Sequence, residues 1–580
     1  MSESIQVKIN NIDIEVPAGT TILKAASLAG FKVPTLCYHP DVQATGACGI
    51  CVVKMENGKT VRSCNMKAIA GKSYTTHDED LLRIRRTILS EVLAKHPQDC
   101  LLCRRNGSCE LQDLAAEFNL RTNDLPREVP DIPVDDSCAV VMDMKYCIQC
   151  MRCVSVCSKQ QNVNALELVG KGREARIQPV GGGTLAESPC VKCGQCAAHC
   201  PVNALKENEA FIPLRHAIAN KELFTTVQIA PAVRVSLGEE FGFKQGDNVA
   251  GKIYAALRRL GFNAIFDTNF GADMTIMEEA TEFVHRFQNK EMLPLITTCC
   301  PSWVEYLERF YDDMIPHFSS SKSPMMMTGV LTKRYYAQKN NIDPQTIFNV
   351  AIMPCTSKKE EKDRKEMAQS DGLQDIDLVL TTRELARMIR QAGIDFTNLK
   401  DEAPDSLLGD FSGAGLIFGA TGGVMEAALR TAAACTGEKL EKLEFQAVRG
   451  LTDIKETTIK VAGQDARIAV THGLVNVQHV LDRVREAKKN NEELPWHFIE
   501  VMACKGGCVS GGGQTYSKEE DTRALRAKGL YDTDKDMSIR QSHENPSVQE
   551  IYATLLEHPG SHKAHELLHT HYTPRPFEKK

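Results

Sequence analysis

Two runs of four cysteines constrain this 580-residue chain more than any other feature. Both have the spacing Cys-x2-Cys-x2-Cys-x3-Cys, and they contain Cys147, Cys150, Cys153 and Cys157, then Cys190, Cys193, Cys196 and Cys200. Four thiolates at this spacing hold a [4Fe–4S] cluster, and where two runs occur, the fourth cysteine of each ligates the other cluster. We therefore expect Cys200 to complete the first cluster and Cys157 to complete the second.

The remaining composition is that of an ordinary globular protein with 22 cysteines. At short, regular spacings, cysteines in a chain without a secretory signal are more often metal ligands than disulfide partners. The net charge of -6 gives no sign of a nucleic-acid or anionic-membrane partner. No apolar run approaches the roughly 20 residues that a membrane helix needs. We expect a cytoplasmic protein without a membrane span.

The first part of the chain predicts a small domain with a cluster of its own. Residues 5–16 alternate as two strands around an Asn10–Asn11 turn, and a helix capped by Thr20 or Thr21 follows. Four cysteines come next, namely Cys37, Cys48, Cys51 and Cys64. This segment resembles the plant-type ferredoxin β-grasp domain, although its first two cysteine gaps are longer. Four thiolates here suit a [2Fe–2S] cluster.

The next segment predicts a cluster with one histidine ligand. Helical periodicity over residues 79–95 leads into His96, and three cysteines follow, namely Cys100, Cys103 and Cys109. Three thiolates are one short of a cubane, so His96 is the natural fourth ligand, although an isolated histidine is more often a surface or core residue. The segment resembles both electron-input subunits of respiratory complex I and iron-only hydrogenases, so it does not separate them.

Beyond about residue 211 the chain predicts a larger α/β domain. Strand-like runs at 226–230 and 350–353 alternate with amphipathic helices, expected at 249–260, 274–287 and 382–392. This alternation favours layers with mostly parallel strands, in which ligands gather at the loops that leave the strands.

Three motifs in that domain supply cysteines that none of the other clusters uses. They are Thr298-Cys299-Cys300-Pro301, Met353-Pro354-Cys355-Thr356-Ser357-Lys358-Lys359 and Glu500-Val501-Met502-Ala503-Cys504-x3-Cys508. They closely resemble the three signatures of [FeFe]-hydrogenases, and residues 418–426 also look like that family. The resemblance covers essentially the whole chain, with the accessory domains in the order of the large clostridial type. It implies an H-cluster, which is a [4Fe–4S] cubane joined to a diiron unit with carbonyl, cyanide and dithiolate ligands.

The resemblance also assigns roles to the residues of these motifs. The implied cubane ligands are Cys300, Cys355, Cys504 and Cys508, and the last of them would bridge to the diiron unit. The implied pocket wall comprises Lys358, Ala230, Pro231, Met353 and Met502. Lys358 would donate to one cyanide, and the Ala230–Pro231 backbone would be the partner of the other. The two methionines would supply adaptable side chains, although core filling explains them nearly as well.

A proton relay to solvent is implied in the same way. Cys299 lies beside a ligand but is not needed for the cubane, and in the family this thiol passes protons to the bridging amine. Glu279 and Glu282 share a helix face at i and i+3, where such a pair is usually just a solvated surface. Because Ser319 and Arg286 also match family positions, we interpret Cys299, Glu279, Ser319 and Glu282 as the relay.

Together these patterns predict a multidomain α/β and α+β protein. Its expected segments are a [2Fe–2S] domain at 1–78, a His-ligated [4Fe–4S] domain at 79–120, a linker at 121–137, a two-cluster domain at 138–210 and the H-cluster catalytic domain at 211–580. The expected reaction is reversible conversion of H2 into two protons and two electrons. One [2Fe–2S] and three [4Fe–4S] clusters would carry the electrons, and maturation proteins would build the H-cluster.

The identity of the electron partner stays open at this point. The chain has no GxGxxG fingerprint in a βαβ context, so we do not expect it to reduce NAD alone. The resemblance implies ferredoxin, or flavin- and iron–sulfur-containing partner subunits of an NAD(P)-linked or electron-bifurcating complex. Met325 stands where glutamine is common in clostridial enzymes, and this slightly favours the multi-subunit form. Thr298 and Lys505 are the other departures from the family pattern.

Other interpretations leave some of these residues without a role. A complex I subunit has no use for the three carboxy-terminal motifs. An iron–sulfur assembly factor lacks the amino-terminal ferredoxin domain and a counterpart of Cys299, which hydrogen sensors also tend to lose. We expect Cys138 and Cys435 to be ordinary buried thiols. The carboxy-terminal histidines are expected to be surface or helix residues rather than metal ligands, and they are His562, His565, His569 and His571.

Overall fold

The computed structural model describes residues 3–120, 125–369, 371–438, 440 and 442–577. It divides into two compact units, and each is described by itself. The first unit comprises Met1–Lys159, Asn164–Ser188 and His199–Lys206, and the second comprises Gln160–Val163, Pro189–Ala198 and Glu207–Lys580. No helix among the described residues is long and apolar enough to cross a membrane.

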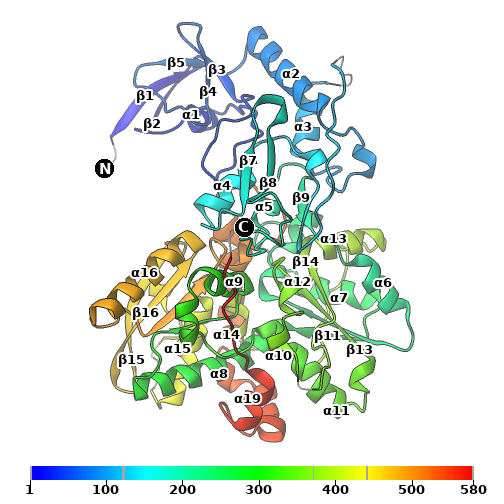
Figure 1. Cartoon of the computed structure of the whole chain (residues 1–580), viewed down its shortest axis with the longest axis vertical. Helices are drawn as coiled ribbons and strands as arrows, with labels where there is room; N and C mark the ends of the chain where they lie inside the picture. The colour runs from blue at the N-terminus through cyan, green and yellow to red at the C-terminus, as the bar shows by residue number, and fades with distance from the viewer. Residues whose placement is uncertain (1–2, 121–124, 370, 439, 441, 578–580) are drawn as a thin grey trace. The chain divides into compact units, whose positions relative to one another are not determined.

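A five-stranded sheet opens the first unit (Figure 1). Its strand order is β2-β1-β5-β3-β4, with β1 at Ser4–Ile9, β2 at Ile12–Pro17, β3 at Val52–Met55, β4 at Thr60–Arg62 and β5 at Ser73–Thr75. The predicted hairpin is confirmed, because β1 and β2 pair antiparallel around Asn10, whose φ is 53°. Helix α1 (Ile22–Leu28) begins at Thr21, whose side chain accepts a hydrogen bond from the Lys24 amide.

Short elements complete the first unit. They are α2 (Glu79–Ala94), η1 (Cys100–Leu102), α3 (Glu110–Glu117), α4 (Arg152–Lys159) and two small two-stranded sheets, β6 (Val140–Met142) with β9 (Leu205–Glu207) and β7 (Leu166–Val169) with β8 (Arg176–Pro179). The helix predicted at 79–95 is therefore confirmed as α2. Within the predicted linker, residues 121–124 lie outside the described residues, and residues 125–134 form no helix or strand.

One buried cation joins three segments of the first unit. The Arg152 side chain is 1% exposed and makes two hydrogen bonds to the Glu110 carboxylate, at 2.8 and 2.7 Å. The same guanidinium donates to the Tyr38 carbonyl at 2.7 Å and to the His199 carbonyl at 3.3 Å. Arg152 therefore links the loop after Cys37, the start of α3, and the segment before Cys200.

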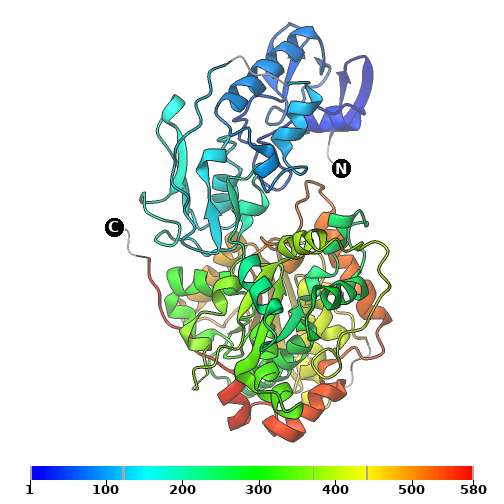
Figure 2. The ribbon, with the colours of Figure 1, turned by 90° about the vertical axis from the view of Figure 1, so that its right-hand side faces the viewer.

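The second unit is built on two four-stranded sheets (Figure 2). One has the order β11-β10-β13-β14 and is parallel throughout, with strands Ala264–Asp267, Phe224–Ile229, Ile347–Met353 and Leu378–Thr381. The other has the order β12-β17-β16-β15, with strands Leu295–Ile296, Phe498–Met502, Gln464–His472 and Ile454–Val461. Only β15 pairs antiparallel among its described strands. The prediction of mostly parallel strands is confirmed.

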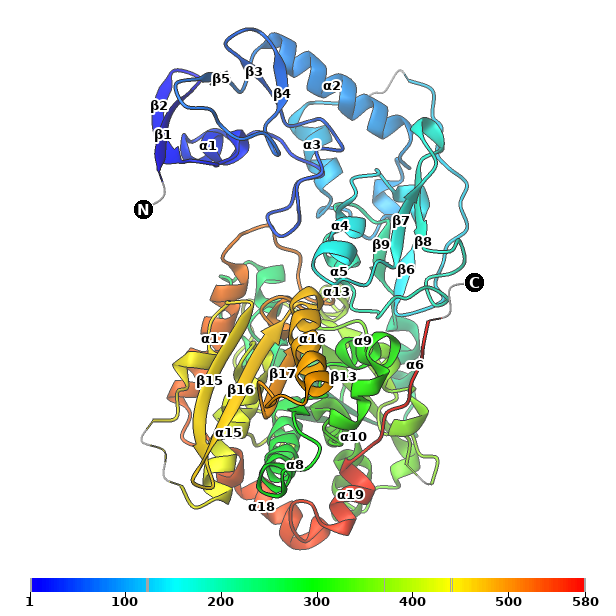
Figure 3. The same cartoon turned by 60° about the vertical axis from the view of Figure 1, so that its left-hand side comes forward.

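Helices cover the faces of these sheets. Helix α16 (Leu474–Asn490) packs on β16 (Figure 3). The predicted helices at 249–260 and 382–392 are α7 (Ala250–Leu260) and α13 (Thr382–Gln391), the latter with a capping box at Thr381 and Glu384. Other helices are α6 (Phe211–Ala219), α9 (Pro301–Phe310), α10 (Pro324–Leu331), α14 (Gly413–Leu416), α15 (Gly423–Cys435), α17 (Thr522–Asp536), α18 (Pro546–Ile551) and α19 (His562–Leu568).

Helix α8 (Thr268–Asn289) is longer than predicted, since the pattern indicated only residues 274–287. Its amino terminus begins at Asp267, whose side chain accepts from the Asn269 amide. The first turns contain Gly271, which weakens a helical pattern in the sequence. A Cβ at this glycine would lie 2.1 Å from the Pro324 carbonyl oxygen, so close packing of α8 against α10 requires the glycine.

Candidate functional site

The four predicted cubane ligands follow the carboxyl ends of parallel strands. Cys300 follows β12 and precedes α9, and Cys355 comes two residues after β13. Cys504 and Cys508 occupy the tight turn after β17, which is the parallel neighbour of β12. All four line a single cavity together with Cys299. The topology thus brings together cysteines that lie up to 208 positions apart in the chain, from Cys300 to Cys508.

The wall of this cavity is almost entirely apolar. All five predicted wall residues line it, namely Lys358, Ala230, Pro231, Met353 and Met502. Further lining residues are Met325 and Phe418, which the resemblance had singled out, and Thr268 and Ala272, which the sequence patterns did not indicate. Lys358 alone carries a charge among the described lining residues. Charge interactions inside such a dry cavity are much stronger than in water.

Close backbone contacts shape the turn around Cys508. Gly507 has a φ of +93°, and a Cβ there would lie 2.7 Å from the Thr421 amide nitrogen. A Cβ at Gly511 would lie 2.2 Å from the Pro354 carbonyl oxygen. These glycines therefore let the Cys508 turn lie directly against the segments that carry Thr421 and Cys355.

The thiols of the cavity fit a metal cluster. Burial, followed by the charge of Cys355, raises the pKa of Cys300 to about 11. Burial and the neighbouring thiolates likewise raise the pKa of Cys504 and Cys508. Thiolates crowded in an apolar cavity need cationic metal to compensate their charge, and the thiolate is the ligating form. These residues suit a cubane of iron and sulfide.

Lys358 is held at the edge of the cavity by two oxygens. Its ammonium donates to the Cys299 carbonyl at 3.1 Å and to the Glu361 carboxylate at 2.7 Å. Burial lowers the pKa of Lys358, but the Glu361 charge outweighs this effect and leaves the pKa above its ordinary value. Lys358 is therefore a fixed cation facing the cavity, and Glu361 is a partner that the sequence analysis did not predict.

Gln514 fastens the loop that follows Cys508. Its carboxamide nitrogen donates to the Ala232 carbonyl at 2.9 Å and to the Cys508 carbonyl at 3.3 Å. Its carboxamide oxygen accepts from the hydroxyls of Ser236 and Thr382, at 2.5 and 2.7 Å. One side chain thus joins the Cys508 turn to the segment after Pro231 and to the start of α13.

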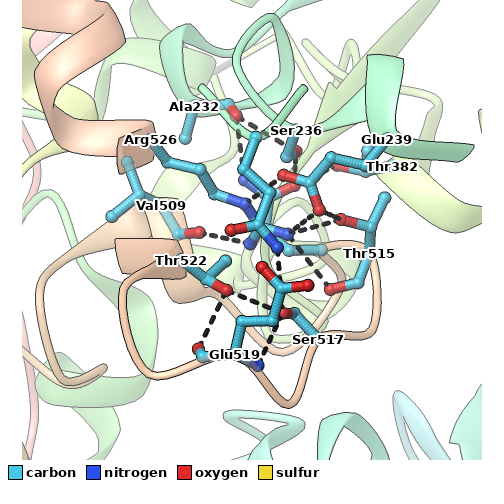
Figure 4. Close-up of polar contacts among 12 residues, drawn as sticks. Ala232, Ser236, Glu239, Thr382, Val509, Thr515, Ser517, Glu519, Thr522 and Arg526 are labelled. Atoms are coloured by element: carbon cyan, nitrogen blue, oxygen red, sulfur yellow. Dashed lines mark hydrogen bonds and ion pairs between the residues drawn. The ribbon is translucent and has the colours of Figure 1, made fainter. Parts of the chain in front are cut away.

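Arg526 of α17 extends this network (Figure 4). Its guanidinium makes two hydrogen bonds of 2.7 Å to the Glu239 carboxylate and donates to the Val509 carbonyl at 2.8 Å. Thr515 accepts from the same guanidinium at 2.5 Å and donates to Glu239 at 2.9 Å. The segment after Cys508 is therefore held in place by buried, charge-assisted hydrogen bonds.

The second cysteine run contributes to the same unit. The carbonyl of Cys193 packs against Gly512, where a Cβ would lie 2.2 Å from the oxygen. Gln195 donates to the Cys504 sulfur at 3.1 Å and to the Ser510 carbonyl at 2.9 Å. The predicted ligands Cys190, Cys193 and Cys196 thus belong to a loop that contacts the turn carrying Cys504. The predicted pairing of Cys157 with this run stays a prediction.

Three of the predicted relay residues lie on α8 and the segment after Phe318, and the fourth, Cys299, lies between β12 and α9. Burial raises the pKa of Glu279 to about 8, while a hydrogen bond from Ser319 lowers it. Burial and then the Glu279 charge raise the pKa of Cys299. The Ser319 hydroxyl donates to Glu282 at 3.1 Å, and Arg286 makes an ion pair with Glu282 at 2.5 Å. These groups extend from the Cys299 thiol, which lines the cavity, to the half-buried Glu282 carboxylate.

The predicted ligands of the first unit also gather in sets. Contact with Cys37 raises the pKa of both Cys48 and Cys64, and Cys51 contacts Cys64. The charge of Cys200 acts on the predicted first cluster run, which consists of Cys147, Cys150 and Cys153. Both arrangements are those that a [2Fe–2S] and a [4Fe–4S] cluster require.

His96 is buried and prepared to be a neutral ligand. Burial lowers the pKa of its imidazole to about 4. Among the described residues, its Nδ1 atom has no hydrogen-bond partner. A neutral imidazole with an open nitrogen is the form that binds metal. The three cysteines that follow His96 differ in exposure, since Cys100 is exposed, Cys103 is half-buried and Cys109 is buried.

Two minor expectations are wrong. Cys435 is exposed, because it is the last residue of α15 and projects beyond the packed part of the helix. His569 is not a plain surface residue, because its ring contacts both Glu278 and Ser320. Cys138 is buried as expected, and His562, His565 and His571 are exposed.

Family models match successive parts of the chain. Residues 224–512 match the iron only hydrogenase large subunit, C-terminal domain, and residues 520–575 match the iron hydrogenase small subunit. Other matches are a 2Fe-2S iron-sulfur cluster binding domain at 2–79, the NADH-ubiquinone oxidoreductase-G iron-sulfur binding region at 85–124 and a 4Fe-4S dicluster domain at 146–204.

Two relatives match almost the full length. The NADP-reducing hydrogenase subunit HndD of Solidesulfovibrio fructosivorans is 41% identical over 98% of this chain and 99% of its own. Iron hydrogenase 1 of Clostridium pasteurianum is 39% identical over 97% of this chain and 99% of its own. The chain belongs to the [FeFe]-hydrogenase family.

A solved structure agrees with this assignment for the second half. The apo [FeFe]-hydrogenase HydA1 from Chlamydomonas reinhardtii is 38% identical and superposes with a TM-score of 0.56, covering 62% of this chain and 98% of that chain. The protein is thus an iron hydrogenase with [2Fe–2S], [4Fe–4S] and H-cluster domains. The predicted family, fold class, enzyme class and kinds of cofactor are confirmed, and the complex I and assembly-factor alternatives are not favoured.

Proposed function

We propose that Cys299 is the group through which this hydrogenase moves protons into and out of the cavity during reversible conversion of H2 into two protons and two electrons. The H-cluster, when bound, supplies the metal centre at which hydrogen is formed or split. Its ligands would be Cys300, Cys355, Cys504 and Cys508. The observation that carries the proposal is the half-buried Cys299 thiol, which lines the cavity and feels the charge of Glu279.

The remaining cavity residues would fix and shield the cluster. Lys358 would hold one anionic ligand with its ammonium, and the Ala230–Pro231 segment would pack against another. Met353 and Met502 would exclude water from the cavity, which strengthens the Lys358 interaction. These roles rest on the lining of the cavity and on the resemblance to the family.

From Cys299 a proton would pass to Glu279, then through Ser319 to Glu282, and leave beside Arg286. A carboxyl with a pKa near 8 is suited to this task, because it both accepts and releases a proton near neutral pH. The hydroxyl of Ser319 contacts both carboxylates. The relay therefore joins the dry cavity to solvent without opening it to water.

Replacing the thiol tests this proposal. Cys299→Ala should lower hydrogen turnover by at least a hundredfold, because removal of a proton-transfer group typically costs this much. Iron content and the infrared bands of bound carbonyl and cyanide should stay unchanged. Near-normal turnover in Cys299→Ala would refute the relay. If the matured wild-type protein shows no carbonyl and cyanide bands, the ligand assignment is refuted instead.

We further propose that the electrons reach partner subunits that bind a nicotinamide nucleotide. One relative is a subunit of an NADP-reducing hydrogenase, whereas this chain has no dinucleotide fingerprint. The electrons would then travel through one [2Fe–2S] and three [4Fe–4S] clusters in the predicted domains at 1–78, 79–120 and 138–210. The cysteine usage supports a cytoplasmic location.

A second candidate is a stand-alone hydrogenase that exchanges electrons with ferredoxin, favoured by the full-length similarity to Iron hydrogenase 1. Purification of the native protein separates the two. Co-purifying flavin- and iron–sulfur-containing subunits with NAD(P)H-linked hydrogen evolution support the complex. A single active chain that works only with ferredoxin refutes it. In either case the matured chain should contain about 20 iron atoms, counting two, twelve and six for the three kinds of cluster.

A further inference from the structure

A segment near the carboxy terminus pairs with the segment that carries the relay hydroxyl. Ser321 and His569 form an antiparallel bridge. The Lys322 amide donates to the Leu568 carbonyl at 2.9 Å, and the Thr570 amide donates to the Ser320 carbonyl at 2.8 Å. Residues 568–570, which comprise the last residue of helix α19 and the two residues after it, therefore form a two-sided backbone contact with residues 320–322.

The two ring nitrogens of His569 make polar contacts to two different segments. Its Nδ1 atom lies 2.8 Å from the Ser320 hydroxyl, and its Nε2 atom lies 2.9 Å from a Glu278 oxygen. The side chains of His569 and Glu278 are 6% and 0% exposed. Glu278 is further held by the Tyr552 hydroxyl at 2.5 Å and the Gly560 amide at 2.8 Å. A buried pair with this many partners has a defined geometry.

Both ends of this contact are direct sequence neighbours of residues of the proposed relay. Glu278 immediately precedes Glu279 on α8, and Ser320 immediately follows Ser319. The Ser320 amide donates to the two Glu282 oxygens, at 3.4 and 3.2 Å, next to the Ser319 hydroxyl bond of 3.1 Å. The Ser319–Ser320 segment thus holds Glu282 on one side and is held by His569 on the other.

We propose that residues 568–570 clamp the relay and that His569 is a positioning residue which sets the contact between Ser319 and Glu282. Ser320 joins the two sides, because its amide binds Glu282 while its hydroxyl binds His569. This inference rests on the proposed relay. It gives the segment that matches the iron hydrogenase small subunit a role in proton transfer, although that segment contributes no residue to the lining of the metal cavity.

Charged groups surround His569 on several elements. Glu278, Glu282 and Arg286 belong to α8, and His562 and His565 belong to α19. The rings of His565 and His569 have centroids 3.9 Å apart, yet His565 is exposed and no hydrogen bond connects it to the relay among those of the described residues. His565 is therefore a matched control for its buried neighbour.

Two substitutions separate the contacts of His569. His569→Asn keeps a polar atom near the Nδ1 position and loses Glu278, whereas His569→Gln reaches toward Glu278 and loses Ser320. We expect a roughly tenfold loss of hydrogen-oxidation turnover in both, because small displacements of reacting groups cost up to a hundredfold. The solvent deuterium isotope effect should rise while the KM for H2 stays unchanged. A purely structural role would lower iron content and turnover together without changing the isotope effect.

The control and the failure outcomes are distinct. His565→Gln should stay within twofold of the wild type. If His569→Asn or His569→Gln does not fold, Ser320→Ala removes only the Nδ1 contact and should show the same isotope effect. Turnover and isotope effect within twofold of wild type in the folded variants would overturn the clamp. In that case the turnover of Glu282→Gln, measured in parallel, locates the error. Wild-type turnover in Glu282→Gln would show that the relay itself is wrong, whereas slow turnover would show that only the clamp is wrong.

Discussion

At the scale of single residues, the proposed mechanism depends on buried groups whose protonation differs from that in water. Glu279 is 2% exposed and lies on α8 beside both Cys299 and Ser319. Burial raises its pKa to about 8, so the carboxyl is mostly protonated at neutral pH. The sequence placed Glu279 and Glu282 on one helix face, but it could not reveal which carboxyl is buried, since burial depends on α10 and the segment after Phe318.

The protonation of Glu279 predicts an infrared signal. A protonated-carboxyl band should be present at pH 7, disappear as the pH rises through about 8, and be absent from Glu279→Gln. Because the folded pKa lies above the unfolded value, the folded state binds the extra proton between about pH 4.5 and 8. Stability should therefore fall as pH rises through this window, and Glu279→Gln should show a flatter dependence. A titrating band that persists in the variant would contradict the assignment.

At the scale of elements, strands and motifs could be predicted, whereas the contacts that hold the motifs together could not. The apolar runs that became β10 and β13 stand out because parallel strands are buried on both faces. The first turns of α8 could not be recognised in the sequence, because Gly271 interrupts the helical pattern. Gln195, Glu361 and Gln514 gave no local signal either. Gln195 and Gln514 act on residues more than 100 positions away, namely Cys504, Ala232 and Thr382.

Gln514 provides a test of this element-level support. Gln514→Ala removes hydrogen bonds that join the Cys508 turn, the segment after Pro231 and the start of α13. Taking the acceptor from the buried Thr382 hydroxyl should cost about 1–3 kcal/mol. We expect less H-cluster per chain, measured by infrared spectroscopy, while clusters of the first unit persist. Gln541→Ala, which removes one surface hydrogen bond from the half-buried Gln541 to Glu544, should change neither quantity.

At the scale of the whole molecule, the compact units do not follow the order of the chain. Residues 189–198, which carry Cys190, Cys193 and Cys196, belong to the second unit, whereas Cys200 belongs to the first. Spacing alone predicted crossed ligation between the two runs. The charge of Cys200 acts on the first run, and the crossed ligation itself stays a prediction. The sequence could not reveal that one loop of a ferredoxin-like pattern packs against the turn carrying Cys504, because that contact exists only in the folded chain.

Arg152 allows the integrity of the first unit to be tested separately. Substitution of this buried arginine removes one charge-assisted donor from the Glu110 carboxylate and from the carbonyls of Tyr38 and His199, and breaking such a pair should cost about 3–5 kcal/mol. Arg152→Ala should therefore lose iron from clusters of the first unit and slow hydrogen turnover with the physiological electron partner. The infrared bands of the H-cluster should remain, because its proposed ligands lie in the second unit. Arg83→Ala removes an exposed arginine with a 3.5 Å ion pair and should behave like the wild type. Equal loss of both kinds of cluster in Arg152→Ala would show that the two units do not fold independently.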